Sequence, residues 1–231
     1  MVSKRLKTIY SNTDLDKEYD IADAISIVKK NATAKFDESI DVVFNLNVDP
    51  KYQDQMIREV VRMPEGLGKS VRVAVIAKSD KHEEATKAGA DLVGDEDLVA
   101  KIKAGNIDFD FCISTPDMMP KVGQLGKVLG PKGLMPNPKL GSVTNDVAVA
   151  IENAKKGQVE IKADKYGIVH ASIARSSFDE KKIRSNFNAA YSAIKSAKPS
   201  GVKGVYIKKI WIGHTMGPSV RITLSSLIEQ R

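Results

Sequence analysis

The 231-residue sequence has only one cysteine, Cys112, so it cannot form a disulfide bond within the chain. It has no run of 18 apolar residues, and its basic N-terminus is not followed by the apolar segment of a signal peptide. These absences exclude a disulfide scaffold and predict a protein that neither enters nor crosses a membrane. A reducing, cytoplasmic location is the expectation that follows.

Positive charge is in modest excess, with 36 Lys and Arg against 29 Asp and Glu and a pI near 9.3. Such a balance favours a polyanionic partner. The excess is unevenly spread, because residues 67–157 carry 13 basic and 12 acidic side chains and leave 23 basic and 17 acidic for the rest. The polyanion is therefore expected to meet mainly the segments outside residues 67–157.

Hydrophobic periodicity changes twice along the chain. Residues 40–48 and 159–173 alternate apolar and polar side chains, which predicts half-buried strands. Between residues 71 and 155, short apolar strands alternate with helices, a pattern typical of a parallel sheet covered by helices. A long helix and two antiparallel strands, residues 204–212 and 219–224, are expected to close the chain.

The fold class is thus predicted as α/β, with one domain inserted into another. A discontinuous two-layer split α/β domain comprises residues 1–66 and 158–231, and a Rossmann-like three-layer α/β domain comprises residues 67–157. Glycine and proline punctuate both junctions. We expect hinges there, at Gly66, Gly68 and Gly157.

Enzyme signatures are weak. Residues 66–70 (GLGKS) end like a phosphate-binding P-loop, but the position of its first glycine holds Met63. Val71 replaces the third glycine of a dinucleotide fingerprint, so a hinge is the preferred interpretation. The three histidines lack metal-ligand spacing, and Cys112 lies in an apolar run typical of a buried strand. We therefore predict no catalytic residues, no metal and no cofactor.

Two segments are unusual for ordinary connections. Residues 118–140 contain four lysines and no acid, and their glycines and prolines predict an exposed loop after a short helix. Its lysines could follow a phosphate backbone, or the segment could be an ordinary solvated loop. Residues 214–219 (HTMGPS) join two strands, where Gly217 would allow a ligand to approach the backbone and Thr215, Met216 and Ser219 offer contacts.

Both segments carry a family resemblance. MMPKVGQLGKVLGPKGLMPNPK (118–139) and TMGPSVR (215–221) resemble signatures of the bacterial-type ribosomal protein L1 family, the universal stalk protein of the large subunit. KFDE (35–38) and KPSGVKG (198–204) extend the similarity over nearly the whole chain. The resemblance implies a split α/β domain that binds 23S-type ribosomal RNA and an inserted Rossmann-like domain. It also implies a mobile stalk that assists release of deacylated tRNA from the exit site, and repression of the operon mRNA.

The resemblance also implies site residues. Phe36 resembles the RNA-facing aromatic of the family and Lys35 its neighbouring backbone contact. The complete expected RNA-binding set is Lys35, Phe36, Asp164, Lys165, Gly167, His170, Thr215, Met216, Gly217, Ser219 and Arg221. A second contact to RNA or tRNA is considered for Lys121, Lys127, Lys132 and Lys139. The expected partners are large-subunit rRNA, the operon mRNA, exit-site tRNA and the ribosome, with a monomer when free.

Two other classes stay open at this point. The inserted strand and helix array could bind a nucleotide at its strand ends, as in an enzyme. A free-standing RNA chaperone or regulator would share the same charge pattern. Affinity of the chain for a nucleotide would favour the enzyme. Failure to co-sediment with large subunits would favour the free-standing RNA chaperone or regulator.

Overall fold

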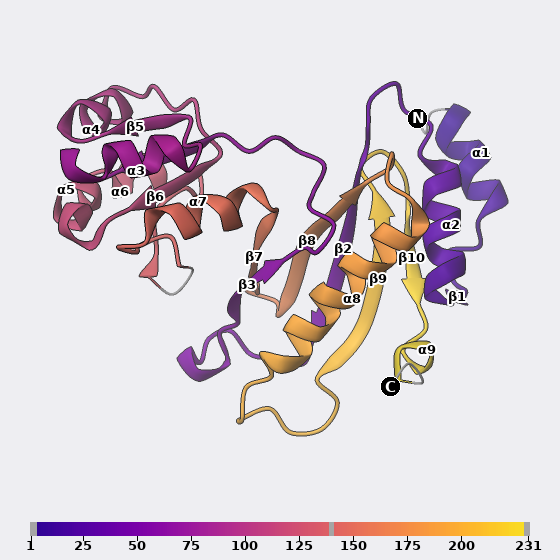
Figure 1. The fold of residues 1–231 in the computed structure, drawn as a ribbon. Helices are drawn as coiled ribbons and strands as arrows, with labels where there is room; N and C mark the ends of the chain where they lie inside the picture. Colours follow the sequence, from indigo (N-terminus) through magenta and orange to yellow (C-terminus); the bar gives the residue numbers. More distant parts are fainter. Residues whose placement is uncertain (1–3, 139–140, 229–231) are drawn as a thin grey trace. The chain divides into compact units, whose positions relative to one another are not determined.

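The computed structural model describes residues 4–138 and 141–228 (Figure 1). Tertiary contacts divide the chain into two compact units. Unit 1 combines residues 1–68 with residues 159–231, and unit 2 consists of residues 69–158. The chain therefore leaves unit 1 once, builds unit 2 and returns.

A five-stranded sheet forms the centre of unit 1, in the strand order β1-β10-β9-β2-β8. Its strands are β1 (Glu18–Tyr19), β2 (Ser39–Leu46), β8 (Ile168–Arg175), β9 (Ile207–His214) and β10 (Ser219–Ile222). All neighbours are antiparallel except β1, which pairs in parallel with β10. The predicted antiparallel pair at the end of the chain is confirmed.

Helices α2 (Ile21–Asn31) and α8 (Glu180–Ser196) pack against one face of this sheet (Figure 1). Strand β2 turns every second residue into that core, among them Phe44, while the residues between are half-buried. The ring centroid of Phe44 lies 6.2 Å from that of Phe187 in α8. Full burial of each ring contributes about 1.5–3 kcal/mol. The two-layer α/β arrangement is confirmed.

Several elements of unit 1 lie where the sequence predicted none. Helix α1 (Lys4–Asn12), which was not predicted, precedes β1. Strand β3 (Arg58–Arg62), also not predicted, pairs in a separate two-stranded sheet with β7 (Gln158–Lys162), a strand that the alternation from residue 159 did predict. Arg58 Nε donates to Glu160 Oε1 across that pair at 2.7 Å. Short helices η1 (Gln53–Gln55) and α9 (Ser225–Ile228) complete the unit.

Unit 2 contains a parallel sheet in the order β5-β4-β6, formed by β5 (Leu92–Gly94), β4 (Val73–Ile76) and β6 (Phe111–Ser114). Side chains of β4 alternate between two cores: Val73 and Val75 pack in one, Ala74 and Ile76 in the other. Because successive strand residues face opposite sides, both faces of the sheet are covered. The helices of unit 2 are η2 (Ser79–Lys81), α3 (His82–Lys87), α4 (Glu96–Lys103), η3 (Pro116–Met118), α5 (Met119–Gly123), α6 (Gly126–Leu129) and α7 (Val147–Lys155).

The prediction of an exposed loop for residues 118–140 is wrong over its first half. This segment forms η3, α5 and α6, and it buries Met118, Val122, Leu125 and Leu129 in the core of unit 2. Pro120 lies in the first turn of α5, where a proline costs no intrahelical hydrogen bond. Within the described part of this segment, the irregular backbone that was expected is found over residues 130–137.

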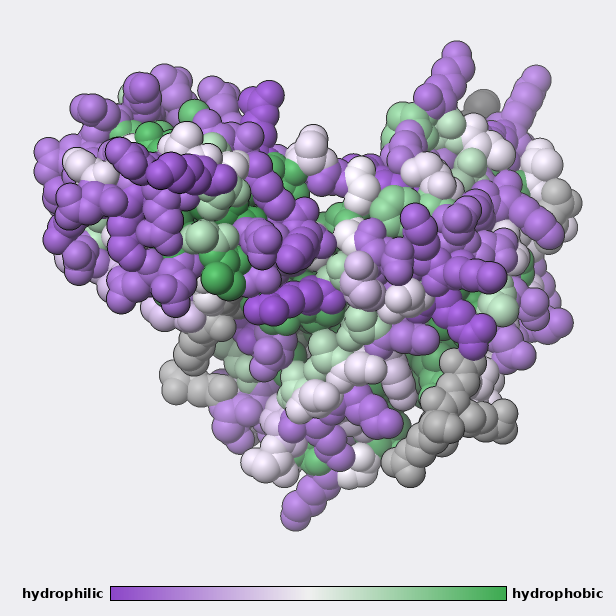
Figure 2. Space-filling view, in the orientation of Figure 1, coloured by the Kyte–Doolittle hydropathy of each residue, from purple (hydrophilic) through white to green (hydrophobic). Residues whose placement is uncertain are grey.

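Hydrophilic residues cover most of the visible face of each unit (Figure 2). In residues 4–138 and 141–228, no helix combines the length and apolar character that a membrane crossing requires.

Candidate nucleic-acid interface

Residues from two distant segments meet at one end of the five-stranded sheet. The register pairs Ser39 with Arg175 and Ile40 with His214, so the loop before β2 and the turn after β9 lie at the same end. We call Lys35, Phe36, Thr215, Met216 and Gly217 the Phe36–Met216 edge. Phe36 is 53% exposed and Met216 49% exposed, although both are large and apolar. Exposed apolar side chains beside lysine are suited to contact unstacked bases.

The turn after β9 is joined to β2 through Thr215. The backbone amide of Thr215 donates to Ser39 O at 3.1 Å, and Ser39 N donates back to Thr215 Oγ1 at 3.0 Å. The hydroxyl of Thr215 is therefore already engaged in holding the turn. Among the three residues of this turn, Met216 offers the largest free side chain.

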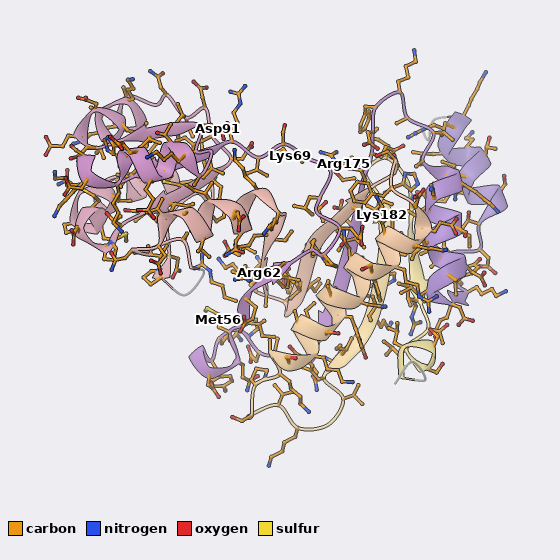
Figure 3. The ribbon with its side chains drawn as sticks, viewed as in Figure 1. Met56, Arg62, Lys69, Asp91, Arg175 and Lys182 are labelled. Carbon is orange, nitrogen blue, oxygen red and sulfur yellow. The ribbon has the colours of Figure 1, made fainter. Side chains whose placement is uncertain are left out.

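Asp37 fixes the loop that carries Phe36. Its carboxylate accepts hydrogen bonds from Ser176 Oγ at 2.8 Å and from the amide and hydroxyl of Ser177 at 3.0 and 2.8 Å. Burial alone would raise the pKa of Asp37, but these hydrogen bonds and the charge of Arg175 lower it. Arg175, labelled in Figure 3, also donates to Asp37 O at 3.1 Å. Phe36 is thus exposed on a loop that is tied down on its C-terminal side.

The sheet face that turns away from α2 and α8 carries three further residues of the expected set. Arg221, Trp211, Val43 and His170 form one row across four strands. His170 is exposed, and Arg221 Nη2 lies 2.7 Å from Glu18 Oε1. Ser219 is exposed at the start of β10. Sequence reasoning missed Trp211, the single tryptophan of the chain, although the alternation of Ile210, Trp211 and Ile212 already turns it away from the core.

The turn of Asp164, Lys165 and Gly167 lies at the other end of the sheet. Asn45 pairs with Ile168, six residues along β2 from Ser39, a separation of about 20 Å. Asp164 Oδ1 accepts from the amides of Tyr166 and Ile168, both at 2.8 Å, so its role is to shape the turn. Lys165 is exposed, with Nζ 5.0 Å from the centre of the Tyr166 ring. The expected RNA-binding residues therefore form two groups.

The lysines considered for a second contact lie in unit 2 and differ in their surroundings. Lys121 Nζ pairs with Glu96 Oε1 at 2.5 Å, and this hydrogen bond raises the pKa of Lys121. Lys127 and Lys132 are exposed. Lys139 lies outside the described residues. The two exposed lysines are better placed than Lys121 for an external phosphate.

The glycines of the expected hinges share one backbone feature. Gly66, Gly68 and Gly157 have φ of 69°, 66° and 94°, a region that favours glycine. Asn186, buried in α8, donates to Gly66 O at 2.9 Å and accepts from Glu65 N at 3.0 Å. The chain is therefore anchored to unit 1 until just before residue 68, where that unit ends.

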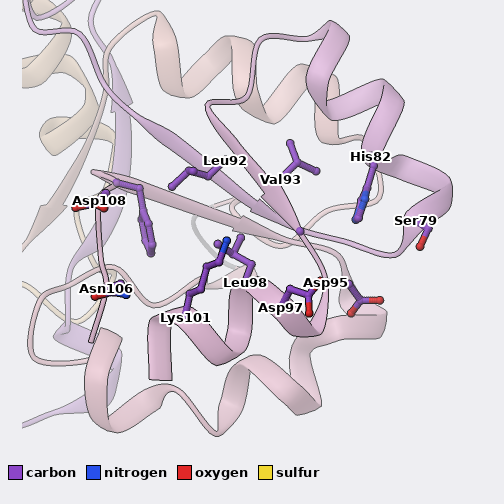
Figure 4. Close-up of a pocket in the computed structure, with 12 residues that line it drawn as sticks. Ser79, His82, Leu92, Val93, Asp95, Asp97, Leu98, Lys101, Asn106 and Asp108 are labelled. Carbon is purple, nitrogen blue, oxygen red and sulfur yellow. The ribbon is translucent and has the colours of Figure 1, made fainter. Parts of the chain in front are cut away.

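A pocket of about 600 Å³ lies beside β5 in unit 2 (Figure 4). Carboxylates outnumber lysines in its lining, with Asp95, Asp97 and Asp108 against Lys101. Such a lining repels the phosphates of a nucleotide. Cys112 is buried in β6, as predicted, and burial raises its pKa to about 12, so its thiol is unreactive. Within the described ranges, no three His, Cys, Asp or Glu side chains are grouped to hold a metal.

These features define a class of protein: an α/β protein of two units, in which unit 1 presents exposed apolar side chains beside lysine at one end of its sheet. Comparison with known proteins identifies the family to which the chain belongs within this class. Residues 28–218 match the ribosomal protein L1p/L10e family. The chain is 55% identical, over 226 residues and 98% of both chains, to the large ribosomal subunit protein uL1 of Neisseria meningitidis serogroup C (strain 053442). The chain has the same identity and coverage with the large ribosomal subunit protein uL1 of Neisseria meningitidis serogroup A / serotype 4A.

The chain belongs to the ribosomal protein L1p/L10e family. These matches confirm the predicted family resemblance. Because the family consists of ribosomal proteins and not of enzymes, they also confirm the prediction that the chain is not an enzyme.

Proposed function

We propose that the chain is a constituent of the large ribosomal subunit, where it binds 23S-type rRNA and forms the mobile stalk at the exit site. The Phe36–Met216 edge is the observation that carries this proposal. In it, residues 35–36 and 215–217 present an aromatic ring, a thioether and an ammonium group on one edge of unit 1. The expected domain bounds, 1–66 with 158–231 and 67–157, then separate an RNA-binding domain from its insertion.

Charge supports RNA binding by the discontinuous domain. That part of the chain holds 23 basic and 17 acidic side chains, whereas the insertion is nearly neutral. Each lysine or arginine that neutralises a phosphate releases condensed counterions, which supplies affinity and makes it depend on salt. Phe36 and Trp211 offer rings on which splayed bases can stack.

The proposal extends to two roles of the bound stalk. Motion at Gly66, Gly68 and Gly157 would allow unit 2 to move with the exit-site tRNA and assist release of deacylated tRNA, with Lys127 and Lys132 as contacts. The same edge of unit 1 would bind the operon mRNA and repress its translation. Free of the ribosome, the protein acts as a cytoplasmic monomer.

A charge reversal at the edge tests rRNA binding. Met216→Asp places a carboxylate against phosphate and should weaken binding of a 23S rRNA transcript by at least about tenfold. Met56→Asp is the matched control, because Met56 is 53% exposed in the same unit and lies outside the site (Figure 3). If both variants bind within twofold of the parent while folded, the edge is not the RNA site.

Co-sedimentation distinguishes the stalk from a free-standing RNA regulator. The parent protein should travel with large subunits through a sucrose gradient, and Met216→Asp should remain near the top. Recovery of the parent in the ribosome-free fractions alone would favour the regulator.

A further inference from the structure

A buried acid and imidazole lie directly beneath the Thr215–Gly217 turn. Glu38 precedes β2, and His214 is the last residue of β9. Their side chains are each 1% exposed, and His214 Nδ1 lies 2.7 Å from Glu38 Oε2. Neither residue belongs to the expected RNA-binding set, and neither is accessible to RNA.

The carboxylate of Glu38 joins three parts of the edge. Oε1 accepts from Ala34 N at 2.9 Å, while Oε2 accepts from His214 Nδ1 and from Met216 N at 2.9 Å. An ionised carboxylate only accepts, so Nδ1 must carry the proton of this hydrogen bond. Burial opposes ionisation, but these hydrogen bonds hold the pKa of Glu38 below its ordinary value.

The backbone of Met216 is held on both sides. Its amide donates to Glu38, and its carbonyl accepts from Arg5 Nη2 of α1 at 2.7 Å. The side chain of Met216 is left exposed. The turn thus has a fixed main chain and a free side chain, as a preorganised contact requires.

Gly217 lies against the other side of the imidazole. A Cβ added to Gly217 would lie 1.9 Å from His214 Nε2, 2.2 Å from Cε1 and 2.8 Å from Cδ2. Gly217 is not among the glycines with positive φ, so its backbone conformation is open to other residues. The His214 ring cannot rotate away from such a Cβ without losing the hydrogen bond between its Nδ1 and Glu38. Among the described residues, Nε2 has no hydrogen-bond partner.

We propose that Glu38 and His214 are the positioning residues of the Thr215–Gly217 turn, and that the His214 ring, not the RNA, imposes glycine at position 217. This inference rests on the proposed rRNA binding by the turn. It assigns a function to two side chains that do not touch RNA. It also changes the reason for Gly217, which the sequence had assigned to close approach of the ligand.

A double-mutant cycle on the full-length chain separates the two explanations. Four proteins are compared: the parent, Gly217→Ala, His214→Ser, and the double variant, each titrated with a 23S rRNA transcript after circular dichroism confirms folding. Serine removes the three ring atoms that lie nearest to the Cβ of an alanine at 217. Gly217→Ala should weaken binding by about tenfold in the parent and by less than about twofold in the His214→Ser background. An equal loss in both backgrounds would show that RNA lies on the glycine and would overturn the proposal.

The hydrogen bond of the pair is tested by a conservative replacement. Asparagine at position 214 can retain an N–H donor toward Glu38, whereas alanine removes it. We expect His214→Asn to bind rRNA within about threefold of the parent and His214→Ala to bind about tenfold more weakly. Equal affinities of the two variants would exclude the pair as a positioning device.

Thermal unfolding of the same four proteins distinguishes failure of this inference from failure of the proposed function. The melting temperature should fall with Gly217→Ala alone and be little changed by it once His214 is serine. If the melting cycle shows this coupling but the parent does not bind rRNA, the proposed function is wrong and the packing of His214 against Gly217 stands. If Gly217→Ala does not fold, the double variant must fold, and an unfolded double variant overturns the inference.

Discussion

The two turns at opposite ends of the unit 1 sheet both use glycine, but for different physical reasons. Gly167 has φ of 75°, and an added Cβ would lie 2.9 Å from Val48 O, so backbone geometry and backbone contact both require it. Gly217 has an ordinary φ, and the three atoms nearest to an added Cβ all belong to the His214 ring. A backbone requirement cannot be relieved from elsewhere, whereas a requirement imposed by a side chain disappears with that side chain.

The largest effect is expected where the Gly217 turn is held. Glu38→Ala leaves His214 Nδ1, Ala34 N and Met216 N without their acceptor in a buried place. We expect the free energy of unfolding to fall by about 3–5 kcal/mol in urea titrations. Glu59→Ala, at an exposed glutamate of β3, is the control and should change it by less than about 0.5 kcal/mol. Similar values for the two variants would mean that the pair contributes nothing to stability.

The Gly167 turn gives the next largest effect. Gly167→Ala forces a left-handed backbone on a residue with a Cβ and should lower the free energy of unfolding by about 1–3 kcal/mol. Its cost should be the same in the parent and in His214→Ser, in contrast to the cost of Gly217→Ala. A Gly167→Ala cost that depends on His214 would abolish the distinction between the turns.

Acid should affect the Gly217 turn through Glu38. The pKa of Glu38 is lower in the folded than in the unfolded protein, so ionised Glu38 stabilises the fold. This stabilisation is fully present at pH values above 4.5, the ordinary pKa of a glutamate. It is lost as the pH falls through the folded-state pKa, below 4.5. Asp37 acts in the same direction. Stability measured across this window should fall more steeply for the parent than for Glu38→Gln, and parallel curves would contradict the assignment.

Salt titrations compare the two ends as RNA contacts. Lys35→Gln at one end and Lys165→Gln at the other should each lower the slope of log affinity against log salt by about 0.7–0.9, if each lysine pairs with one phosphate. Lys182→Gln on α8, labelled in Figure 3, should leave the slope unchanged. A change at only one end would confine the RNA to that turn.

The smallest effect is expected for Arg5→Ala. It removes one exposed hydrogen bond to Met216 O and should weaken rRNA binding by about two- to fivefold. Lys7→Ala removes the same charge from α1 without touching the turn, so the difference between the variants isolates the hydrogen bond. Equal losses would show that only the charge of the helix matters.

The α/β class was predictable because it depends on local periodicity. Ile40, Val42 and Phe44 face the core as their alternation predicts, and Val73 to Ile76 form the central strand of the parallel sheet. The error in residues 118–129 came from giving glycine and proline too much weight. The spacing of Met118, Val122, Leu125 and Leu129 is helical, and it was the better signal.

The organisation of the candidate site could not be predicted in the same way. Glu38 and His214 are 176 residues apart, and no local pattern shows that they pair. The role of Gly217 depends on that pair. Because the pair could not be predicted, the need for glycine at position 217 was attributed to the approach of a ligand. Trp211 is different. The alternation of apolar and outward-facing residues in β9 indicates that its side chain faces away from the core, so its position could have been predicted.

The burial of Cys112 has a practical consequence for fluorescence work. The only native thiol is enclosed in β6, and with a pKa of about 12 it will not compete for maleimide dyes. Val205 in unit 1 and Val149 in unit 2 are 69% and 59% exposed, so cysteines introduced there would be the reactive ones. A donor and acceptor pair on these positions would report energy transfer between the units of single molecules, with the natural cysteine left in place.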